Sequence, residues 1–365
     1  MSNRDSVHWT AVLREREELC RRAPSAHNTQ PWVLRYDNDA VEVGWDPARE
    51  LPDGDPGRRD LFLSLGAFVE TCLIVAADAG LAIRAEITVD EERRTAARLL
   101  PAPELYATPF SARTVELRGC ARGGHTGGRL TAADLDAAQA GLEGTRLVEV
   151  PARELAGLAV RADRWLFGTP PVVRELRTWL RLSRSHPRYA ADGLTYEALD
   201  MSRAEALGLR MVLAPAVYGV LRRLGLARLL AGSQSGLLRY EGSVLVLTTA
   251  AGADTSATGT PATGTTTTPA ALVRAGQELV RVWYALAERG IAVHPLSQLL
   301  DCPLTEQELA RRLGGRERPL AVFRAGRPTG PSVRSARIAV PAKRSRRSAP
   351  VSRAPRRAAT PVPPR

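Results

Sequence analysis

The sequence predicts an α+β fold, in which helical segments of different lengths alternate irregularly with short strand candidates. Apolar residues recur at helical spacing in many segments, whereas strand-like runs are short and lie between turn residues. The chain has 365 residues, 44% of them hydrophobic and 25% charged, which is an ordinary soluble composition. That length and apolar content can bury one large core or two smaller ones.

Helices are predicted where the apolar spacing is three or four residues and the ends carry helix-stopping residues. The first must end before Pro24, because proline lacks an amide donor and restricts the residue before it. Gly80 and Gly290 follow two of the longest segments as C-terminal glycines. Thr305 and Glu308 have the spacing of a capping box. The predicted helices span 8–22, 60–79, 131–142, 151–164, 171–183, 203–213, 215–231, 271–289 and 306–313.

Strands are predicted where apolar or alternating runs lie between turn residues. The first two flank residues 37–39, Asp-Asn-Asp, which suit a hairpin turn. Residues 244–247, Val-Leu-Val-Leu, form a continuous apolar run of the kind found in buried strands. The predicted strands span 33–36, 40–45, 81–89, 115–117, 242–249 and 320–324.

The positive charge is concentrated at the end of the sequence. Residues 341–365 hold eight of the basic residues and no acid, so removing them lowers the net charge from +12 to +4. We expect a disordered, solvated tail there, with only non-specific, salt-sensitive attraction to nucleic acid. Residues 251–269 include eight threonines and are predicted to be a low-complexity loop.

Nothing in the sequence predicts export, a membrane partner or a metal centre. The first ten residues are polar, and no apolar run approaches the roughly 20 residues that span a bilayer. Cys20, Cys72, Cys120 and Cys302 stand singly, without a CxxC pair, so neither a zinc site nor a disulfide framework is expected. We therefore expect a cytoplasmic protein.

Residues 23–32, Ala-Pro-Ser-Ala-His-Asn-Thr-Gln-Pro-Trp, carry the most chemical information. Two prolines and several polar side chains join a predicted helix to a predicted strand. Such a loop can present side chains and backbone amides to the edge of a planar heterocycle. It can equally be a polar turn in which Asn28 and Gln30 satisfy their own backbone. The residue types alone do not choose between these two interpretations.

This segment closely resembles the APSxxNxQPW signature of flavin-dependent nitroreductases, in particular the Acg-like branch of that superfamily. Relatives use the loop to contact FMN. The resemblance implies flavin contacts from Pro24, Ser25, Asn28 and Gln30. Trp32 also matches, and we expect it to be a core aromatic residue.

Two further segments resemble the same superfamily. Residues 56–59, Pro-Gly-Arg-Arg, imply a cofactor contact from Arg58 or Arg59, with a solvated arginine pair as the alternative. Residues 293–297 resemble the strand at the flavin edge, where backbone amides approach the flavin N5. That resemblance implies roles for Leu296 and Ser297.

The last resemblance covers residues 323–328 and 332–337, where relatives carry basic residues that bind the FMN phosphate. It implies Arg334 and Arg337, because an arginine fork pairs two donors with phosphate oxygens. The alternative is that these arginines simply begin the basic tail. If the resemblance is correct, Asn28 and Arg337 must lie close enough for one FMN to contact both.

One motif departs from the superfamily pattern R-[RH]-[ST]-x-R/K. The corresponding stretch is residues 124–129, where Gly124 and Gly128 replace the basic residues, and the resemblance leaves His125 and Thr126 as cofactor contacts. Arg122 or Arg129 could substitute from a shifted position, or glycine-rich backbone amides could bind phosphate. Losing a cation beside the flavin N1/O2 edge would lower the reduction potential.

The order of the motifs implies two related lobes fused in tandem. Residues 1–112 would form a truncated first lobe and 113–340 a second, with a helical insertion at 171–231 and the Thr-rich loop at 251–269. The implied architecture is nitroreductase-like: central antiparallel or mixed sheets surrounded by helices in an intrachain pseudo-dimer. One chain would then hold a complete flavin site, so we expect a monomer rather than an obligate homodimer.

The resemblance implies an FMN-dependent oxidoreductase that takes electrons from NADH or NADPH and reduces a small nitro or quinone-like electrophile. No catalytic side chain is assigned, because the flavin carries the chemistry. The alternative function is FMN binding without turnover, for storage, sequestration or redox sensing, which the replaced basic residues favour.

Overall fold

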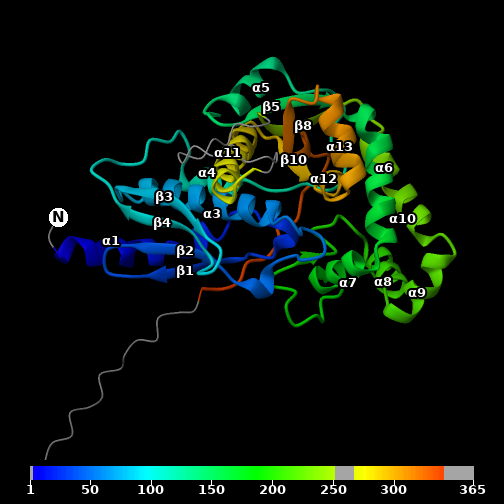
Figure 1. Cartoon of the computed structure of the whole chain (residues 1–365), viewed down its shortest axis with the longest axis horizontal. Helices are drawn as coiled ribbons and strands as arrows, with labels where there is room; N and C mark the ends of the chain where they lie inside the picture. The colour runs from blue at the N-terminus through cyan, green and yellow to red at the C-terminus, as the bar shows by residue number, and fades with distance from the viewer. Residues whose placement is uncertain (1–2, 251–266, 341–365) are drawn as a thin grey trace, which may run out of the picture.

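The computed structural model describes residues 3–250 and 267–340, and within these ranges the fold is α+β (Figure 1). The predicted tail, 341–365, lies outside the described residues, as does most of the predicted Thr-rich loop. Two four-stranded sheets, both antiparallel throughout, contain most of the strand residues. A third, two-stranded sheet is parallel.

The first sheet has the order β1-β2-β4-β3. Its strands are β1 (Trp32–Tyr36), β2 (Val41–Trp45), β3 (Ile83–Asp90) and β4 (Thr95–Pro101). The predicted hairpin pairs Trp32 with Trp45, and the Asp37 amide donates to the Ala40 carbonyl to close the turn. Strand β4 was not predicted, because its alanines and its arginine have low strand propensity and its pairing with two neighbours stabilises it instead.

The second sheet has the order β5-β8-β10-β9. Its strands are β5 (Arg146–Pro151), β8 (Ser243–Ala250), β9 (Ala292–Pro295) and β10 (Glu317–Gly326). Strand β8 is central, and its side chains alternate between two hydrophobic cores: Val244 and Val246 join one, whereas Leu245 and Leu247 join the other. Burial on both faces explains the continuous apolar run in the sequence.

Two 20-residue helices, α3 (Arg59–Asp78) and α11 (Pro269–Glu288), pack together between the sheets (Figure 1). They approach very closely where Gly66 meets Gly276. A Cβ atom on Gly66 would lie 1.9 Å from the Val273 carbonyl oxygen, and one on Gly276 would lie 2.2 Å from that of Leu63. Only glycine at both positions permits this backbone contact.

Helix α3 corrects the expectation that the chain has no apolar run of membrane-spanning size. By length and composition alone it could cross a membrane, but 89% of its most apolar window is buried inside the protein. The first sheet and α11 cover it, so the apolar composition of α3 reflects its position at the centre of the fold.

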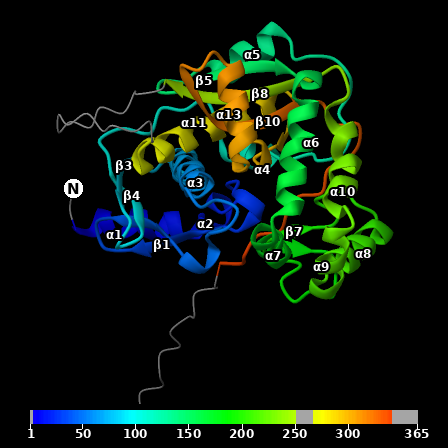
Figure 2. The same ribbon diagram turned by 45° about the vertical axis from the view of Figure 1, so that its right-hand side comes forward.

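Among the remaining helices, α1, α2 and α4 contribute to the core of the first sheet, and the others cover the second sheet or form a separate cluster. Helices α6, α12 and α13 share a core with one face of the sheet, whereas α5 and α11 share a core with the other. Helices α7–α10, with β6 and β7, form their own small core at one corner of the molecule (Figure 2). The bounds are α1 (Asn3–Glu15), α2 (Glu17–Cys20), α4 (Ala112–Leu117), α5 (Ala132–Gln139), α6 (Ala152–Gly168), α7 (Pro170–Trp179), β6 (Leu180–Arg181), β7 (Leu194–Thr195), α8 (Arg203–Val212), α9 (Pro215–Arg223), α10 (Leu226–Gln234), α12 (Gln298–Asp301) and α13 (Pro303–Arg312).

Three predicted elements were wrong. Residues 115–117 lie in helix α4, which Ser111 and Thr114 cap, and not in a strand. The predicted helix 215–231 is divided at Gly225, whose φ of 94° is incompatible with a continuing helix. Helix α13 begins at Pro303, and the Thr305 hydroxyl donates to the Leu299 carbonyl, so Thr305 and Glu308 do not form the predicted capping box.

Candidate functional site

The proline-bounded loop between α2 and β1 has a strained backbone. The φ angles of His27, Asn28 and Gln30 are 46°, 55° and 52°, in a region that residues with a side chain seldom adopt. Local hydrogen bonds hold this shape: the Gln30 amide donates to the Ser25 hydroxyl, and the Ala26 amide donates to that of Ser64. Strain that surrounding contacts maintain is typical of a functional segment.

Asn28 joins this loop to two distant parts of the chain. Its side-chain amide donates to the carbonyl of Gly193 at 3.0 Å and to that of Ala336 at 3.0 Å. Its carbonyl oxygen accepts from Arg337 at 2.9 Å. Asn28 and Arg337 are therefore in direct contact, which satisfies the condition set by the sequence hypothesis.

Gln30 makes equivalent contacts deeper in the protein, where it is 1% exposed. Its side-chain amide donates to the Ala191 carbonyl, and its carbonyl oxygen accepts from the Ile338 amide. Neither Asn28 nor Gln30 behaves as a simple turn residue. Together they clamp residues 191–193 and 336–338 against the loop.

Arg337 stabilises the same junction. Its guanidinium group donates to the carbonyls of Arg21, Arg22 and Ala23, as well as to Asn28. Most of its donors are thus committed to protein acceptors around the C-terminal turn that follows α2. This geometry makes Arg337 a positioning residue, with little remaining capacity for a phosphate.

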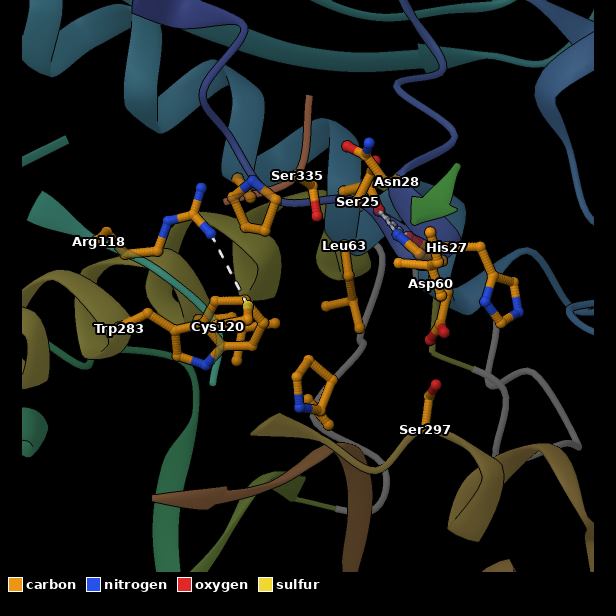
Figure 3. Close-up of a pocket in the computed structure, with 18 of the residues that line it drawn as sticks. Ser25, His27, Asn28, Asp60, Leu63, Arg118, Cys120, Trp283, Ser297 and Ser335 are labelled. Carbon is orange, nitrogen blue, oxygen red and sulfur yellow. Dashed lines mark hydrogen bonds between the residues drawn. The ribbon is translucent and has the colours of Figure 1, made fainter. Parts of the chain in front are cut away.

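A pocket of about 240 Å³ opens beside the clamp. Its wall combines the proline-bounded loop, the first turns of α3, one face of α11, residues 118–122, the end of β9 with the start of α12, and the segment 333–337. In Figure 3, Arg118, Cys120 and Trp283 lie on one side of the pocket and Asn28, His27 and Asp60 on the other. Segments that are far apart in the sequence therefore enclose one cavity.

The structure brings together about half of the predicted cofactor contacts. The predicted residues that line the pocket are Pro24, Ser25, Asn28, Ser297, Arg334 and Arg337. The predicted residues outside the lining are Gln30, Arg58, His125, Thr126 and Leu296. Leu296 is instead a buried core residue between the second sheet and α12.

Arg58 and Arg59 point to different surroundings. Arg58 forms ion pairs with Glu50 and Glu91, away from the pocket. Arg59 lines the pocket and is bound by the carboxylates of Asp60 and Asp301, at 2.8 and 2.7 Å. Of the pair left open by the sequence, Arg59 is the one at the site, and its charge is already neutralised.

His125 and Thr126 support the end of β10 rather than the pocket. His125 forms an isolated bridge with Pro328, and the Thr126 amide donates to the Arg327 carbonyl. His125 is 8% exposed, and burial, followed by the nearby Arg324 guanidinium, lowers its pKa to about 4. It is therefore neutral at physiological pH.

A segment before residues 124–129 also has arginines at the spacing of the cationic pattern, and it lies at the pocket. Residues 118–122, Arg-Gly-Cys-Ala-Arg, carry basic residues at the first and fifth positions, as the superfamily pattern R-[RH]-[ST]-x-R/K does. Arg118, Cys120 and Arg122 all line the pocket, whereas residues 125–129 do not. Gly119 stands where the pattern has Arg or His, and Cys120 where it has Ser or Thr, so the sequence favours His125 and Thr126 over this segment.

Five arginines line the pocket without a carboxylate partner at ion-pair distance among the described residues: Arg22, Arg118, Arg122, Arg334 and Arg337. Burial, followed by repulsion from Arg118 and Arg22, lowers the pKa of Arg337 to about 9. Burial also lowers the pKa of Arg122 and, together with the same two neighbours, that of Arg334. Such a cluster repels itself until an anion binds, so its chemistry fits a phosphorylated ligand.

The opposite side of the pocket carries His27 and the ion pair of Arg59 with Asp60. Burial lowers the pKa of His27 to about 4, although the Asp60 carboxylate opposes that shift. His27 is therefore neutral at pH 7. The walls between the two sides include the apolar side chains of Leu63, Leu300 and Val322. The pocket can accordingly hold a molecule that has an anionic end and a largely apolar body.

Comparisons with known proteins give local sequence similarity. No protein-family model matches the chain. Two proteins of Mycobacterium tuberculosis, strains CDC 1551 / Oshkosh and ATCC 25618 / H37Rv, are each named "Putative NAD(P)H nitroreductase" and are 40% identical to it over 62 residues. The match covers 17% of this chain and only 18% of the length of each relative.

A crystal structure of oxidized iodotyrosine deiodinase, bound to FMN and 3-iodo-L-tyrosine, aligns with 64% of this chain and 97% of its own, with 13% identity and a TM-score of 0.34. A likeness at this level establishes neither a shared fold nor shared chemistry. The sequence similarity of this chain is therefore to nitroreductases, it is local, and it agrees with the resemblance of the motifs.

Proposed function

We propose that this protein binds FMN in the arginine-lined pocket and, with NADH or NADPH as electron donor, reduces a small nitro or quinone-like electrophile. The observation that carries the proposal is the group of five arginines, without a carboxylate partner in the described part of the chain, around a cavity with apolar walls. FMN combines a phosphate with a planar aromatic ring system, which suits both parts of this site. When bound, the flavin supplies the hydride and electron transfer chemistry.

Three arginines are the best candidates to hold the anionic and N1/O2 parts of the flavin. Arg118, Arg122 and Arg334 line the pocket and retain guanidinium donors. One donor of Arg118, Nε, is buried without any acceptor among the described residues. Charge-assisted hydrogen bonds from such groups are among the strongest that a protein offers an anion.

The position of Arg118 and Arg122 also favours a reductase over a silent flavin carrier. The carrier interpretation rested on glycines at 124 and 128 in place of basic residues. Since Arg118 and Arg122 line the pocket at the motif spacing, a cation is available near the bound flavin to stabilise its reduced, anionic form.

We further propose that the site belongs to an intrachain pseudo-dimer of the Acg-like kind, with lobes at 1–112 and 113–340. Each part has its own four-stranded antiparallel sheet and its own central 20-residue helix, which supports this division. The pocket takes residues from both parts, among them Ser25 and Asp60 from the first and Trp283 and Ser297 from the second.

Reconstitution followed by anaerobic reduction tests the function. The purified protein is saturated with FMN, freed of excess flavin, and mixed with NADH or NADPH without oxygen while the visible spectrum is recorded. We expect the yellow colour to be retained after desalting and then to bleach with at least one nucleotide. Retained colour that neither nucleotide bleaches would support the carrier, and loss of FMN on desalting would refute both functions.

A further inference from the structure

The helices of the insertion expose an unusual number of large apolar side chains. Of the ten large hydrophobic residues that are exposed in the described part of the chain, six lie between residues 207 and 229. They are Leu207, Met211, Val217, Val220, Leu224 and Leu229, with exposed fractions from 41% to 77%. We call the solvent-facing side of α8, α9 and α10 that carries them the insertion surface.

Helical spacing groups these residues along the outer sides of the helices. Leu207 and Met211 are four residues apart on α8, and Val217 and Val220 are three apart on α9, followed by Leu224 at its end. The inward sides hold Ala206, Leu213 and Tyr218, which are buried. These helices are thus amphipathic, with a second apolar side that no described residue covers.

The insertion surface is also strongly basic. Residues 203–229 contain five arginines, all exposed, and one acid, Glu205. None of these arginines has an ion-pair partner among the residues that the structure describes. The arginines are Arg203, Arg210, Arg222, Arg223 and Arg228.

The position of these helices leaves them accessible to a flat partner. Helices α8 and α9 lie at a corner of the molecule, away from α3 and α11 (Figures 1 and 2). The two helices bend by 78° at the break between them. By length and composition alone, the pair is long and apolar enough to enter a bilayer. With arginines beside the apolar side chains, they have the pattern of a helix pair that lies in the interface of a membrane.

We propose that the insertion surface binds the surface of an anionic lipid bilayer, with its apolar side chains in the headgroup region and its arginines against anionic headgroups. Charge decides between this partner and a second copy of the chain. A symmetric dimer through the surface would place five arginines and one acid against the same set, which is repulsive. An anionic bilayer attracts those arginines and accepts the leucines. The proposal is independent of the flavin chemistry.

Co-sedimentation of the full chain with vesicles tests the proposal. We expect binding to vesicles of phosphatidylcholine with phosphatidylglycerol, and little binding to phosphatidylcholine alone. The double variant Leu224→Gln/Leu229→Gln should reduce partitioning by about tenfold or more, since two exposed leucines no longer enter the headgroup region. The matched control is Leu105→Gln/Leu304→Gln, two leucines that are 54% and 72% exposed elsewhere and should leave binding unchanged.

The full chain keeps the basic residues of 341–365 in every variant, so their attraction is the same throughout. Equal binding of the two double variants would overturn the proposal, because it would assign the attraction to the tail or to net charge. Equal binding to both vesicle types would also overturn it.

Light scattering of vesicle-free samples tests whether a second copy of the chain is the partner instead. Self-association that Leu224→Gln/Leu229→Gln abolishes would mean that a second copy covers the surface. If that variant misfolds by circular dichroism, Arg222→Gln/Arg223→Gln serves instead, and unchanged binding would then refute the proposal.

Discussion

Individual arginines at the pocket differ in what they can offer a ligand. Arg337 has committed its donors to the carbonyls of residues 21–23 and to Asn28, and Arg59 is neutralised by two carboxylates. Among the described residues, the half-buried Arg122 side chain donates only to the Ala198 carbonyl, and desolvation lowers its pKa. A bound anion would relieve that unfavourable burial, so the free energy of ligand binding should depend most on the arginines that lack acidic partners.

We therefore predict that Arg122→Gln weakens FMN binding, whereas Arg129→Gln does not. Loss of a charge-assisted hydrogen bond or nearby charge should raise the Kd by roughly tenfold to a hundredfold. Arg129 lies outside the pocket and pairs with Glu149 on an exposed part of the surface. Quenching of flavin fluorescence on titration with apoprotein measures both Kd values. Weaker binding in Arg129→Gln alone would restore the motif assignment at 124–129.

His125 should make stability depend on pH. Its pKa is about 4 in the folded protein and about 6.5 when unfolded. Above pH 6.5 both states are neutral. As the pH falls from 6.5 to 4, the unfolded chain binds a proton that the folded protein does not, so the free energy of unfolding decreases, by about 1–3 kcal/mol. Below pH 4 both states are protonated and this loss ends.

The variant His125→Gln isolates that contribution. Urea unfolding of both proteins at pH 8, 6 and 4.5 gives the difference in unfolding free energy at each pH. We expect the difference to shift in favour of His125→Gln as the pH falls, because glutamine does not titrate. Other groups such as Asp55, whose pKa burial raises to about 7, titrate equally in both proteins and cancel. A difference that is constant over this range would contradict the assignment.

At the level of elements, the crossing of α3 and α11 determines how the two sheets meet. Gly276→Ala would place a methyl group 2.2 Å from the Leu63 carbonyl oxygen, so the helices must separate. We expect a loss of about 3 kcal/mol or more in the free energy of unfolding, measured by denaturant titration. The matched control is Gly157→Ala in α6, where a Cβ atom has open space and should be neutral or slightly stabilising. Similar losses in both variants would indicate that helix separation is not the cause.

The elements also show which parts of the fold could be predicted from sequence. The hairpin of β1 and β2, and the helices α3 and α11, were predicted because periodicity, turn residues and terminal glycines agree there. Strand β4 was missed because its residues have low strand propensity, although β3 lies directly before it in the chain. Strand β5 was missed because, among the described strands, it pairs only with β8, which is far away in the sequence. At the site, Asn28 could be predicted because its loop has a distinctive sequence. Arg118 could not, because residues 22, 118 and 334 come together around one cavity only in the folded chain.

At the level of the whole molecule, residues from both parts of the chain, 1–112 and 113–340, line the described pocket. The clamp at Asn28 and Gln30 fixes this arrangement within a chain, because it binds segments that lie 161 to 308 positions away. An assembly that shares its flavin between subunits would need some of these contacts to come from a partner.

We therefore predict a monomer that binds one FMN. Light scattering during size exclusion should give a mass close to 39.4 kDa, and the ratio of flavin to protein should approach one after reconstitution. Dilution over a wide concentration range should not release flavin in step with subunit dissociation, because the pocket closes within a chain. A stable dimer that loses its flavin when diluted into monomers would show instead that the site requires a second copy, and the intrachain pseudo-dimer would have to be abandoned. A dimer that dilutes to monomers with full flavin content would leave the pocket within one chain.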